Sequence, residues 1–279
     1  MKLETYRQIV EECHKINANK LDSLNEKFSG ISERTLGSII SQEYQKKTKR
    51  FYHMHHSPDV TNSYYEQYLK ASKTCKQPGY LLDIAEKADL SPALMARIIL
   101  EKYYTKDGES VNKQQINQIM KDTTLIEDKD FAVEIYLCIL NDEMYGYVSD
   151  VTKQCIGIDY ENKLKNELQI LGVAFTDEDE LREKGYDKTP DIKLEVPIAI
   201  DGHIINWIES KASFGDEENH KTYMREQYWS YWNRFGPGLV IYWFGFIEEL
   251  DTNQDKGILL KDHMPKNISF INPSLLIKL

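Results

Sequence analysis

Cysteine is scarce in this chain of 279 residues and occurs in no pattern that binds metal. The four cysteines are far apart, without a CxxC or Cys/His spacing: Cys13, Cys75, Cys138 and Cys155. This usage argues against zinc-binding modules and against disulfide-rich secreted domains. We therefore expect a reducing compartment.

Long hydrophobic runs and targeting segments are also missing. The longest apolar run, from Gly238 to Ile247, is too short to span a bilayer, which takes about 20 residues. The first seven residues, Met1 to Arg7, contain no apolar stretch of the kind that a signal peptide needs. These absences predict a soluble intracellular protein.

Positive charge is in short supply and unevenly distributed. The chain has 35 Lys and Arg against 45 Asp and Glu, a net charge of −10. Residues 1–130 have a net charge of +1, and residues 131–279 one of −11. A net-acidic chain binds nucleic acid only through local clusters of Lys and Arg, and the split favours the first half for such a cluster.

Hydrophobic spacing divides the chain into a helical half and a mixed half. Residues 1–150 show helical periodicity, which predicts a helical region. Residues 151–279 are predicted to form an α+β or α/β domain with a mixed sheet. Its expected elements are a helix over about 158–171, a short strand at 173–175, a hairpin over 191–212, a long helix over about 217–235 and a strand from about 239 that is buried on both faces.

Residues 81–101 have the pattern of two helices joined by a tight turn. Ser91 is placed to cap the second helix, and Pro92 occupies its first position, where a missing N–H costs nothing. The small Ala85 allows the two helices to approach closely, as in a helix-turn-helix. The residues that would face a DNA groove are mostly not base readers. An ordinary helical hairpin without nucleic acid is an equal alternative.

The most basic stretch of the chain covers residues 46–56. Its four cations are predicted to contact nucleic-acid phosphates or to act as a nuclear localisation signal: Lys46, Lys47, Lys49 and Arg50. A plain solvated helix face is the alternative. Three histidines at 53, 55 and 56 have no further ligand at zinc spacing, so a metal site is not expected there.

Two carboxylates and one ammonium group in the second half suit Mg²⁺-dependent phosphodiester hydrolysis. Asp191 opens the first hairpin strand, and Glu209 and Lys211 lie in the second. Glu161 lies on the preceding helix. Carboxylate oxygens are hard ligands that bind Mg²⁺ while several waters stay on the ion. Because side chains alternate along a strand, Glu209 and Lys211 share one face, and we expect them on a rim that carries chemistry rather than packing.

The turn of this hairpin decides whether the site can form. A two-residue turn at Asp201-Gly202 with an unbroken ladder would place Asp191 and Glu209 on opposite faces of the sheet. We therefore predict a three-residue loop with Gly202 at its third position, or otherwise a bulge near Pro197, which cannot donate to the ladder.

The order of these residues resembles the PD-(D/E)XK nuclease superfamily. Pro190-Asp191 is followed 18 residues later by Glu209 in a Glu-x-Lys pattern, after a helix that bears Glu161. Longer stretches are similar to the eukaryotic codanin-interacting nuclease family, and together they spread over almost the whole chain: residues 41–46, 94–97, 184–191, 202–205, 207–216 and 229–243.

The resemblance implies a role for each residue of the pattern. Asp191 and Glu209 would be the principal metal ligands, and Lys211 the base that positions water. Glu161 would act through water or through a second metal ion. A further implied catalytic residue is Gln227, which with Tyr231 matches a Gln-x-x-x-Tyr element of some superfamily branches.

The resemblance also implies the organisation of the chain. Residues 151–279 would form a nuclease domain related to Holliday-junction resolvases. Residues 1–150 would form helix-turn-helix-like units that position nucleic acid. A codanin-like protein would be the partner, and the nucleus and the cytoplasm the location.

Two hypotheses follow for function. The first is a nuclease that depends on Mg²⁺ or Mn²⁺ and hydrolyses DNA, including branched or single-stranded DNA. The second is a largely non-catalytic interaction protein whose nuclease fold serves as a binding partner of codanin. The intact acid and lysine pattern favours the nuclease, whereas the scarcity of basic residues in the second half weakens it.

Overall fold

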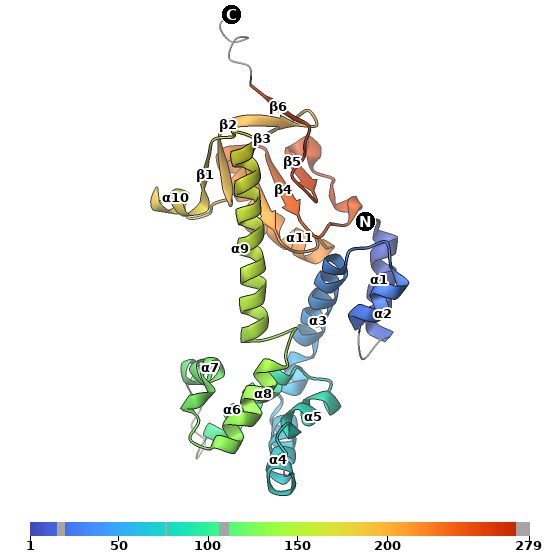
Figure 1. Ribbon diagram of the computed structural model, residues 1–279, viewed down its shortest axis with the longest axis vertical. Helices are drawn as coiled ribbons and strands as arrows, with labels where there is room; N and C mark the ends of the chain where they lie inside the picture. Colours follow the sequence, from blue (N-terminus) through green and yellow to red (C-terminus); the bar gives the residue numbers. More distant parts are fainter. Residues whose placement is uncertain (16–19, 76, 106–111, 272–279) are drawn as a thin grey trace, which may run out of the picture. The chain divides into compact units, whose positions relative to one another are not determined.

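The computed structural model describes residues 1–15, 20–75, 77–105 and 112–271, which form two compact units (Figure 1). The sheet unit contains Met1–Ile40 and Cys155–Leu279, and the helical unit contains Ser41–Gln154. The predicted boundary after residue 150 lies close to the observed one. Residues 1–40, however, which we assigned to the helical half, belong to the sheet unit.

Contacts distant in sequence explain why the first 40 residues join the sheet unit. The ring of Tyr6 stacks on Phe214, with centroids 5.6 Å apart. The Thr35 hydroxyl donates to the carbonyl of Phe244 at 2.8 Å. The Ser38 hydroxyl accepts the N–H of Phe214 at 2.9 Å. Helical periodicity shows that such residues bury one face but does not show against what.

The helical unit packs around one central helix. Its elements are the second part of α3 (Glu33–His55), α4 (Pro58–Thr74), α5 (Tyr80–Lys87), α6 (Pro92–Tyr104), α7 (Lys113–Lys121), a 3₁₀ turn (Thr123–Leu125), α8 (Lys129–Leu140) and the start of α9 (Tyr147–Ile170). Seven of the 13 residues of α6 are buried: Ala93, Leu94, Met95, Ala96, Ile98, Ile99 and Leu100. Helix α6 is therefore the core of this unit.

The predicted helix boundary at Ser91 is present. The Ser91 hydroxyl accepts the N–H of Leu94 at 3.2 Å, and Pro92 follows at the first helical position. Ala93, Met95 and Ala96, which would have to enter a groove, are at most 2% exposed. Helices α5 and α6 form a helical hairpin that turns these residues into the core, and contact with nucleic acid through α6 stays a prediction.

The sheet unit contains one mixed sheet, as predicted. Its strand order is β1-β2-β3-β4-β5, and β6 pairs with β2. The β1, β2 and β3 pairings are antiparallel, whereas those of β3, β4 and β5 are parallel. The strands are β1 (Phe175–Asp177), β2 (Ile192–Ile200), β3 (His203–Lys211), β4 (Gly238–Tyr242), β5 (Ile258–Lys261) and β6 (Ile268–Phe270).

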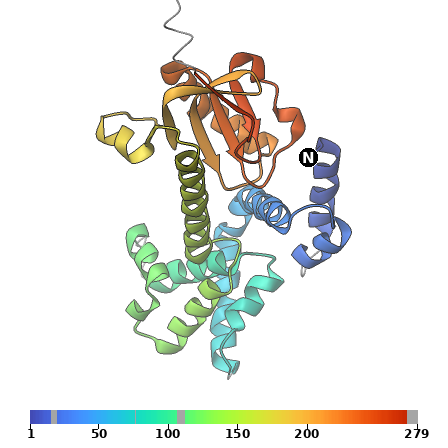
Figure 2. The ribbon, with the colours of Figure 1, turned by 45° about the horizontal axis from the view of Figure 1, so that its top comes forward.

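The sheet unit also contains helices and 3₁₀ turns. Besides parts of α3 and α9, they are α1 (Leu3–Lys15), α2 (Lys20–Lys27), α10 (Glu178–Glu183), α11 (Glu217–Tyr223), a π-helical segment (Met224–Tyr228), α12 (Trp229–Phe235) and 3₁₀ turns at Glu248–Leu250 and Gln254–Lys256. Helix α9 lies along one face, and α10 stands at the β1 edge (Figures 1 and 2). The predicted helix over 217–235 is thus present, but with a π-helical middle.

Alternation along β3 assigns the functional residues to one of these faces. Leu164 and Leu168 of α9 pack in one core with Ile208. Tyr228 packs in the other core with Trp207. Glu209 and Lys211 lie two and four residues after Trp207 in β3, so their side chains point to the same face as the Trp207 side chain. This is the face covered by α12 and the π-helical segment.

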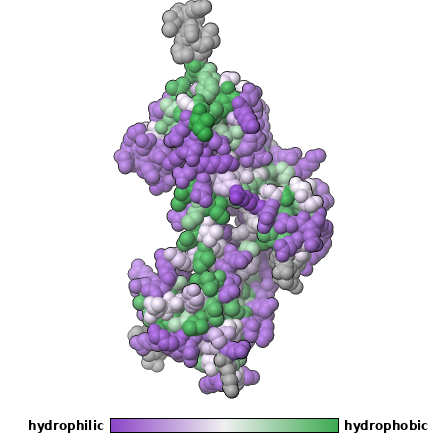
Figure 3. Space-filling model, in the orientation of Figure 1, coloured by the Kyte–Doolittle hydropathy of each residue, from purple (hydrophilic) through white to green (hydrophobic). Residues whose placement is uncertain are grey.

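The face drawn in Figure 3 is largely polar, with apolar patches on both units. On α8, Val133, Tyr136 and Leu140 are between 43% and 52% exposed. Within the described ranges, we find no helix whose length and apolar character would let it cross a membrane.

Candidate active site

An irregularity in β2 brings Asp191 opposite Glu209. The hairpin turn itself has two residues, because Ile200 pairs with His203, and both Asp201 and Gly202 have positive φ angles, of 50° and 83°. The predicted three-residue loop is therefore wrong. The register shifts between Lys193 and Ile198, around Pro197, as the second form of that prediction required.

The size of this shift sets the faces. Near the turn, the residue numbers of partners sum to 403, as for Ile198 and Ile205, but beyond the irregularity they sum to 400, as for Ile192 and Ile208. The shift of three residues is odd, so it moves side chains of β2 to the opposite face relative to β3. One further step in the same register places Asp191 opposite Glu209.

Hydrogen bonds hold these side chains together. The backbone N–H of Ser210 donates to Asp191 Oδ2 at 2.7 Å. The backbone N–H of Asp191 points to Glu209 Oε2 at 3.4 Å. Lys211 Nζ donates to Glu209 Oε1 at 2.6 Å. Each member of the predicted pattern therefore contacts another, although the two carboxylates come from positions 18 residues apart.

The site is buried rather than placed on a rim. The Glu209 side chain is 3% exposed and the Lys211 side chain 17%. The indole N–H of Trp243 donates to the Ser210 hydroxyl at 2.8 Å, which holds Ser210 on the other face as alternation predicts. The expectation that these residues take no part in packing is wrong, since β3 lies in the middle of the sheet.

Burial and mutual repulsion dominate the electrostatics of the site. Burial, and then the charge of Glu209, raise the pKa of Asp191 well above its usual value, while Lys211 opposes this rise. Burial alone would lower the pKa of Lys211, but Glu209 and Asp191 outweigh it and raise that pKa above its ordinary range. Lys211 is thus held as a cation. Its Nζ also lies 4.7 Å from the ring centroid of Tyr223.

Glu161 lies within electrostatic reach of this group. Burial, and then the carboxylates of Glu178 and Glu209, raise the pKa of Glu161. Within the described ranges, no three His, Cys, Asp or Glu side chains are close enough together to hold a metal ion directly. A role of Glu161 as a direct ligand therefore stays a prediction.

Glu178 is a residue of this neighbourhood that we did not predict. It is the first residue of α10, and its Oε1 accepts the Thr189 hydroxyl at 3.1 Å and Arg182 Nη2 at 2.7 Å. The preceding Asp177 caps this helix in a capping box with Glu180. The capping box can be recognised in the sequence, but the proximity of Glu178 to Glu161 cannot.

Gln227 and Tyr231 come from the helix that covers the site. Gln227 lies in the π-helical segment, and its Oε1 is buried with no hydrogen-bond partner among the described residues. Burial, and then Glu209 and Asp191, raise the pKa of Tyr231, which is 4% exposed. Single π turns are frequent at functional sites, and a buried carbonyl oxygen without a donor suits a group that arrives with the substrate.

The donor set fits a hard divalent cation. Asp191 and Glu209 present carboxylate oxygens in a buried place where the negative charge is only partly offset by one ammonium group. One or two carboxylates, with water in the other positions, are a usual environment of Mg²⁺. Asp191 and Glu209 are therefore the residues that would hold such an ion.

The predicted phosphate-binding residues lie on α3 in the helical unit. Lys46 Nζ lies 2.8 Å from Glu43 Oε1, and Lys47 forms an ion pair with Asp89. Lys49 and Arg50 are exposed. Two of the four cations thus contact carboxylates of the same unit, and Lys49 and Arg50 remain the stronger candidates for contact with phosphate.

Comparison with known proteins places this geometry in a family. A family model described as "Protein of unknown function TPD sequence-motif" matches residues 127–264, which include Thr189-Pro190-Asp191. CDAN1-interacting nuclease 1 of Xenopus laevis is 51% identical over 246 residues, or 88% of this chain and 81% of that protein. The chain belongs to the CDAN1-interacting nuclease 1 family.

Other members are equally similar. The Homo sapiens protein of that name is 50% identical over 249 residues, 89% of each chain. The Danio rerio protein is 48% identical over 267 residues, 95% of this chain and 89% of the other. The resemblance to codanin-interacting nucleases is therefore confirmed. No solved structure matches the chain, so the PD-(D/E)XK assignment stays a prediction.

Proposed function

We propose that this protein is a divalent-metal-dependent nuclease that hydrolyses phosphodiester bonds of DNA, including branched or single-stranded DNA. The observation that carries the proposal is the convergence of Asp191, Glu209 and Lys211, produced by an odd register shift in an otherwise regular hairpin. The relatives are named nucleases, which supports the same reaction class.

Each side chain of the site has a proposed task. Asp191 and Glu209 would hold Mg²⁺ or Mn²⁺, which would polarise the phosphoryl oxygen and make a bound water more acidic. Lys211 stays protonated beside Glu209, so it orients the attacking water and offsets developing negative charge rather than removing a proton. This changes the predicted role of Lys211 as a base.

Two further residues act around this centre. Glu161 lies close enough to influence the pKa of Asp191, and it accepts a proton or a hydrogen bond through water. Gln227 directs its unpartnered Oε1 to a donor such as the nucleophilic water. Tyr231 is buried and close enough for both carboxylates to raise its pKa, and we propose that it helps to exclude solvent from them.

The partner belongs to the same proposal. Relatives are named for their interaction with CDAN1, and we propose a codanin-like protein as partner of this chain, in the nucleus and the cytoplasm. The second candidate function, a binding protein without significant catalysis, is favoured by the charge of the sheet unit. That unit has 20 Lys and Arg against 28 Asp and Glu, a net charge of −8.

A cleavage panel separates the two functions. The full chain is incubated with single-stranded, duplex, flap and four-way DNA, and with RNA strands of matched sequence, in Mg²⁺, in Mn²⁺ and in EDTA. The nuclease cleaves at least one DNA substrate in either metal and none in EDTA. Absence of cleavage on every substrate, by a chain that binds its codanin-like partner, would support the binding protein instead.

Reversing the charge of Lys49 and Arg50 is expected to weaken nucleic-acid binding. Each phosphate contact that is lost reduces the slope of log K against log salt concentration by about 1, because fewer counterions are released. Binding is measured by fluorescence anisotropy at several salt concentrations. Lys70→Glu with Lys73→Glu, on the exposed side of α4, is the matched control. If the slope of log K against log salt concentration is the same in the Lys49, Arg50 variant as in the Lys70, Lys73 control, this part of α3 does not contact phosphate.

A further inference from the structure

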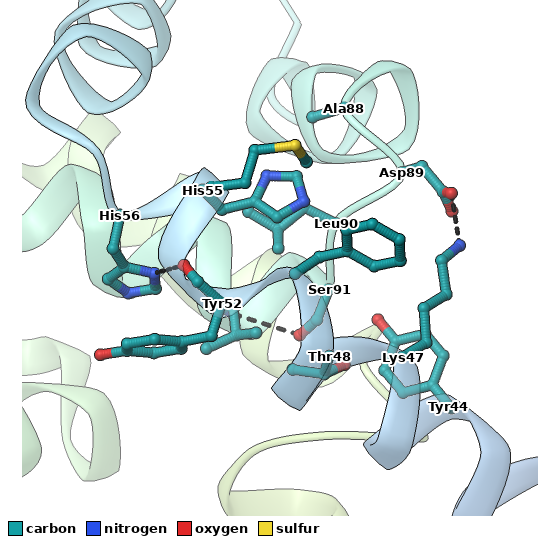
Figure 4. Close-up of a pocket in the computed structure, with 13 residues that line it drawn as sticks. Tyr44, Lys47, Thr48, Tyr52, His55, His56, Ala88, Asp89, Leu90 and Ser91 are labelled. Carbon is teal, nitrogen blue, oxygen red and sulfur yellow. Dashed lines mark hydrogen bonds and ion pairs between the residues drawn. The ribbon is translucent and has the colours of Figure 1, made fainter.

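A pocket of about 170 Å³ lies in the helical unit, outside the candidate active site (Figure 4). Its walls come from residues 44–56, in α3 and directly after it, and from residues 88–94, which form the turn after α5 and the start of α6. None of the residues assigned to the nuclease reaction lines it. The pocket therefore contains no group of the proposed reaction.

Exposed aromatic rings form part of the wall. Tyr52 and His56 are stacked, with ring centroids 3.8 Å apart and an interplanar angle of 20°. A hydrogen bond of 3.0 Å between His56 Nδ1 and the carbonyl of Tyr52 fixes this arrangement. Tyr52 is 46% exposed and the neighbouring Phe51 40%. Aromatic rings of this size that stay in contact with water inside a pocket offer a ready-made stacking surface.

Polar groups accompany these rings. Lys47 and Asp89 form an ion pair at the edge of the pocket, with 35% and 78% of their side chains exposed (Figure 4). An exposed ion pair contributes little to stability, so both groups can exchange partners at low cost. Thr48 and Ser91 also line the pocket, although the Ser91 hydroxyl is already hydrogen-bonded to Asp142 and to the N–H of Leu94.

Two exposed cations flank the pocket on α3. Lys49 lies three residues before Tyr52 and seven before His56, and Arg50 lies three residues after Lys47. Residues at these spacings are neighbours on a helix surface, so Lys49 and Arg50 lie on the two sides of the helix face that lines the pocket. The stretch from 46 to 56 contains four Lys and Arg and no Asp or Glu.

We propose that this pocket binds an unpaired base of single-stranded nucleic acid. The base stacks on the ring of Tyr52 or Phe51, Asp89 accepts a hydrogen bond from a base amino or imino group, and the adjoining phosphates contact Lys49 and Arg50. Stacking on aromatic side chains within a cationic surface is how proteins bind single strands without sequence preference. The proposal rests on the proposed function only in taking nucleic acid as the ligand.

An apolar peptide segment fits these observations less well. The apolar side chains of Met54, Leu90 and Leu94 also line the pocket, but the same wall carries an ion pair and a stacked Tyr–His pair, which an apolar segment would leave unused. Lys49 and Arg50 lie beside the pocket in a stretch, residues 46–56, that contains no Asp or Glu, and such a cationic surface favours a polyanion.

Fluorescence of a single-stranded oligonucleotide that contains 2-aminopurine tests the proposal in EDTA, where the proposed nuclease does not act. The base is quenched on stacking, and anisotropy of a labelled strand gives the affinity. We expect Tyr52→Ala with Phe51→Ala to remove the quenching and to weaken single-strand binding about tenfold or more. Tyr52→Phe keeps both, because it keeps the ring. Tyr136→Ala, a tyrosine 51% exposed on α8, is the matched control and changes neither.

Two results would overturn the proposal. One is unchanged quenching and affinity in the Tyr52→Ala, Phe51→Ala variant with an unchanged circular dichroism spectrum. The other is that the same double variant still binds single strands but no longer binds the codanin-like partner, since the pocket would then be a protein-binding site. Failure of the proposed function is recognised independently, by absence of metal-dependent cleavage in the wild-type chain while the stacking signal is present.

Discussion

Glu209→Gln is expected to abolish metal-dependent cleavage, with a loss of about 10²- to 10³-fold or more. The substitution keeps the shape of a side chain that is 3% exposed, but it removes a charged ligand and the partner of Lys211 at 2.6 Å. Groups that stabilise charge in a buried site have effects of this size, because no solvent replaces them. The measurement is the initial rate of cleavage of the best DNA substrate at saturating Mg²⁺.

Glu218→Gln is the matched control for this experiment. Glu218 lies on α11, close in sequence to the site, but it is exposed. The control is expected to cleave at the wild-type rate. Full activity of folded Glu209→Gln would remove the proposed mechanism, because no other carboxylate lies opposite Asp191.

Lys211→Met is expected to lower the free energy of unfolding by about 3–5 kcal/mol, as does the loss of one partner from other buried ion pairs. The variant leaves the carboxylates of Asp191 and Glu209 buried without their ammonium group. Adding Glu209→Gln in the same chain restores part of the loss, because one of the two uncompensated charges is removed. Urea denaturation of the two single variants and the double variant measures this coupling.

The pH dependence of this loss has a defined sign. An acid whose pKa is raised in the folded state destabilises that state fully above the folded pKa; the destabilisation shrinks as the pH falls below the folded pKa and is gone below the unfolded pKa. The pKa of Asp191 is already raised with Lys211 present. The deficit of Lys211→Met is therefore smaller at acid pH than at neutral pH.

An exposed ion pair provides the comparison. Lys193→Met breaks a pair with Glu195 whose atoms are 3.4 Å apart and whose side chains are 30% and 47% exposed. We expect it to change the unfolding free energy by less than about 1 kcal/mol. Equal stability of Lys211→Met and Lys193→Met would contradict the burial of the Lys211–Glu209 pair.

Local signals in the sequence predicted the elements of the sheet unit well. Asp201-Gly202 marked the hairpin, and both residues have the positive φ angles that such a turn uses. The apolar run after Gly238 predicted a strand buried on both faces, and all five residues of β4 are buried. The short strand predicted at 173–175 lies two residues further on, at Phe175–Asp177.

Features that depend on tertiary contacts were not predictable in the same way. Asp191 and Glu209 can share a face only if the register of the hairpin shifts by an odd number of residues. The sequence did not show where this shift lies: Asp201-Gly202 forms a regular two-residue turn, and the shift is found around Pro197. The π-helical segment has no local sequence signal, because it differs from an α-helix only in hydrogen-bond spacing. The position of Glu178 near Glu161 depends on how β1 pairs with β2.

Calorimetric titration of Mn²⁺ into the full chain tests the central claim most directly, namely that Asp191 and Glu209 form one metal site. We expect saturable binding that strengthens as the pH rises and releases protons, because the metal displaces a proton from a carboxyl group whose pKa is raised. Asp191→Asn and Glu209→Gln should each remove the binding signal, and Glu218→Gln should retain it. Wild-type affinity in both site variants would contradict the account.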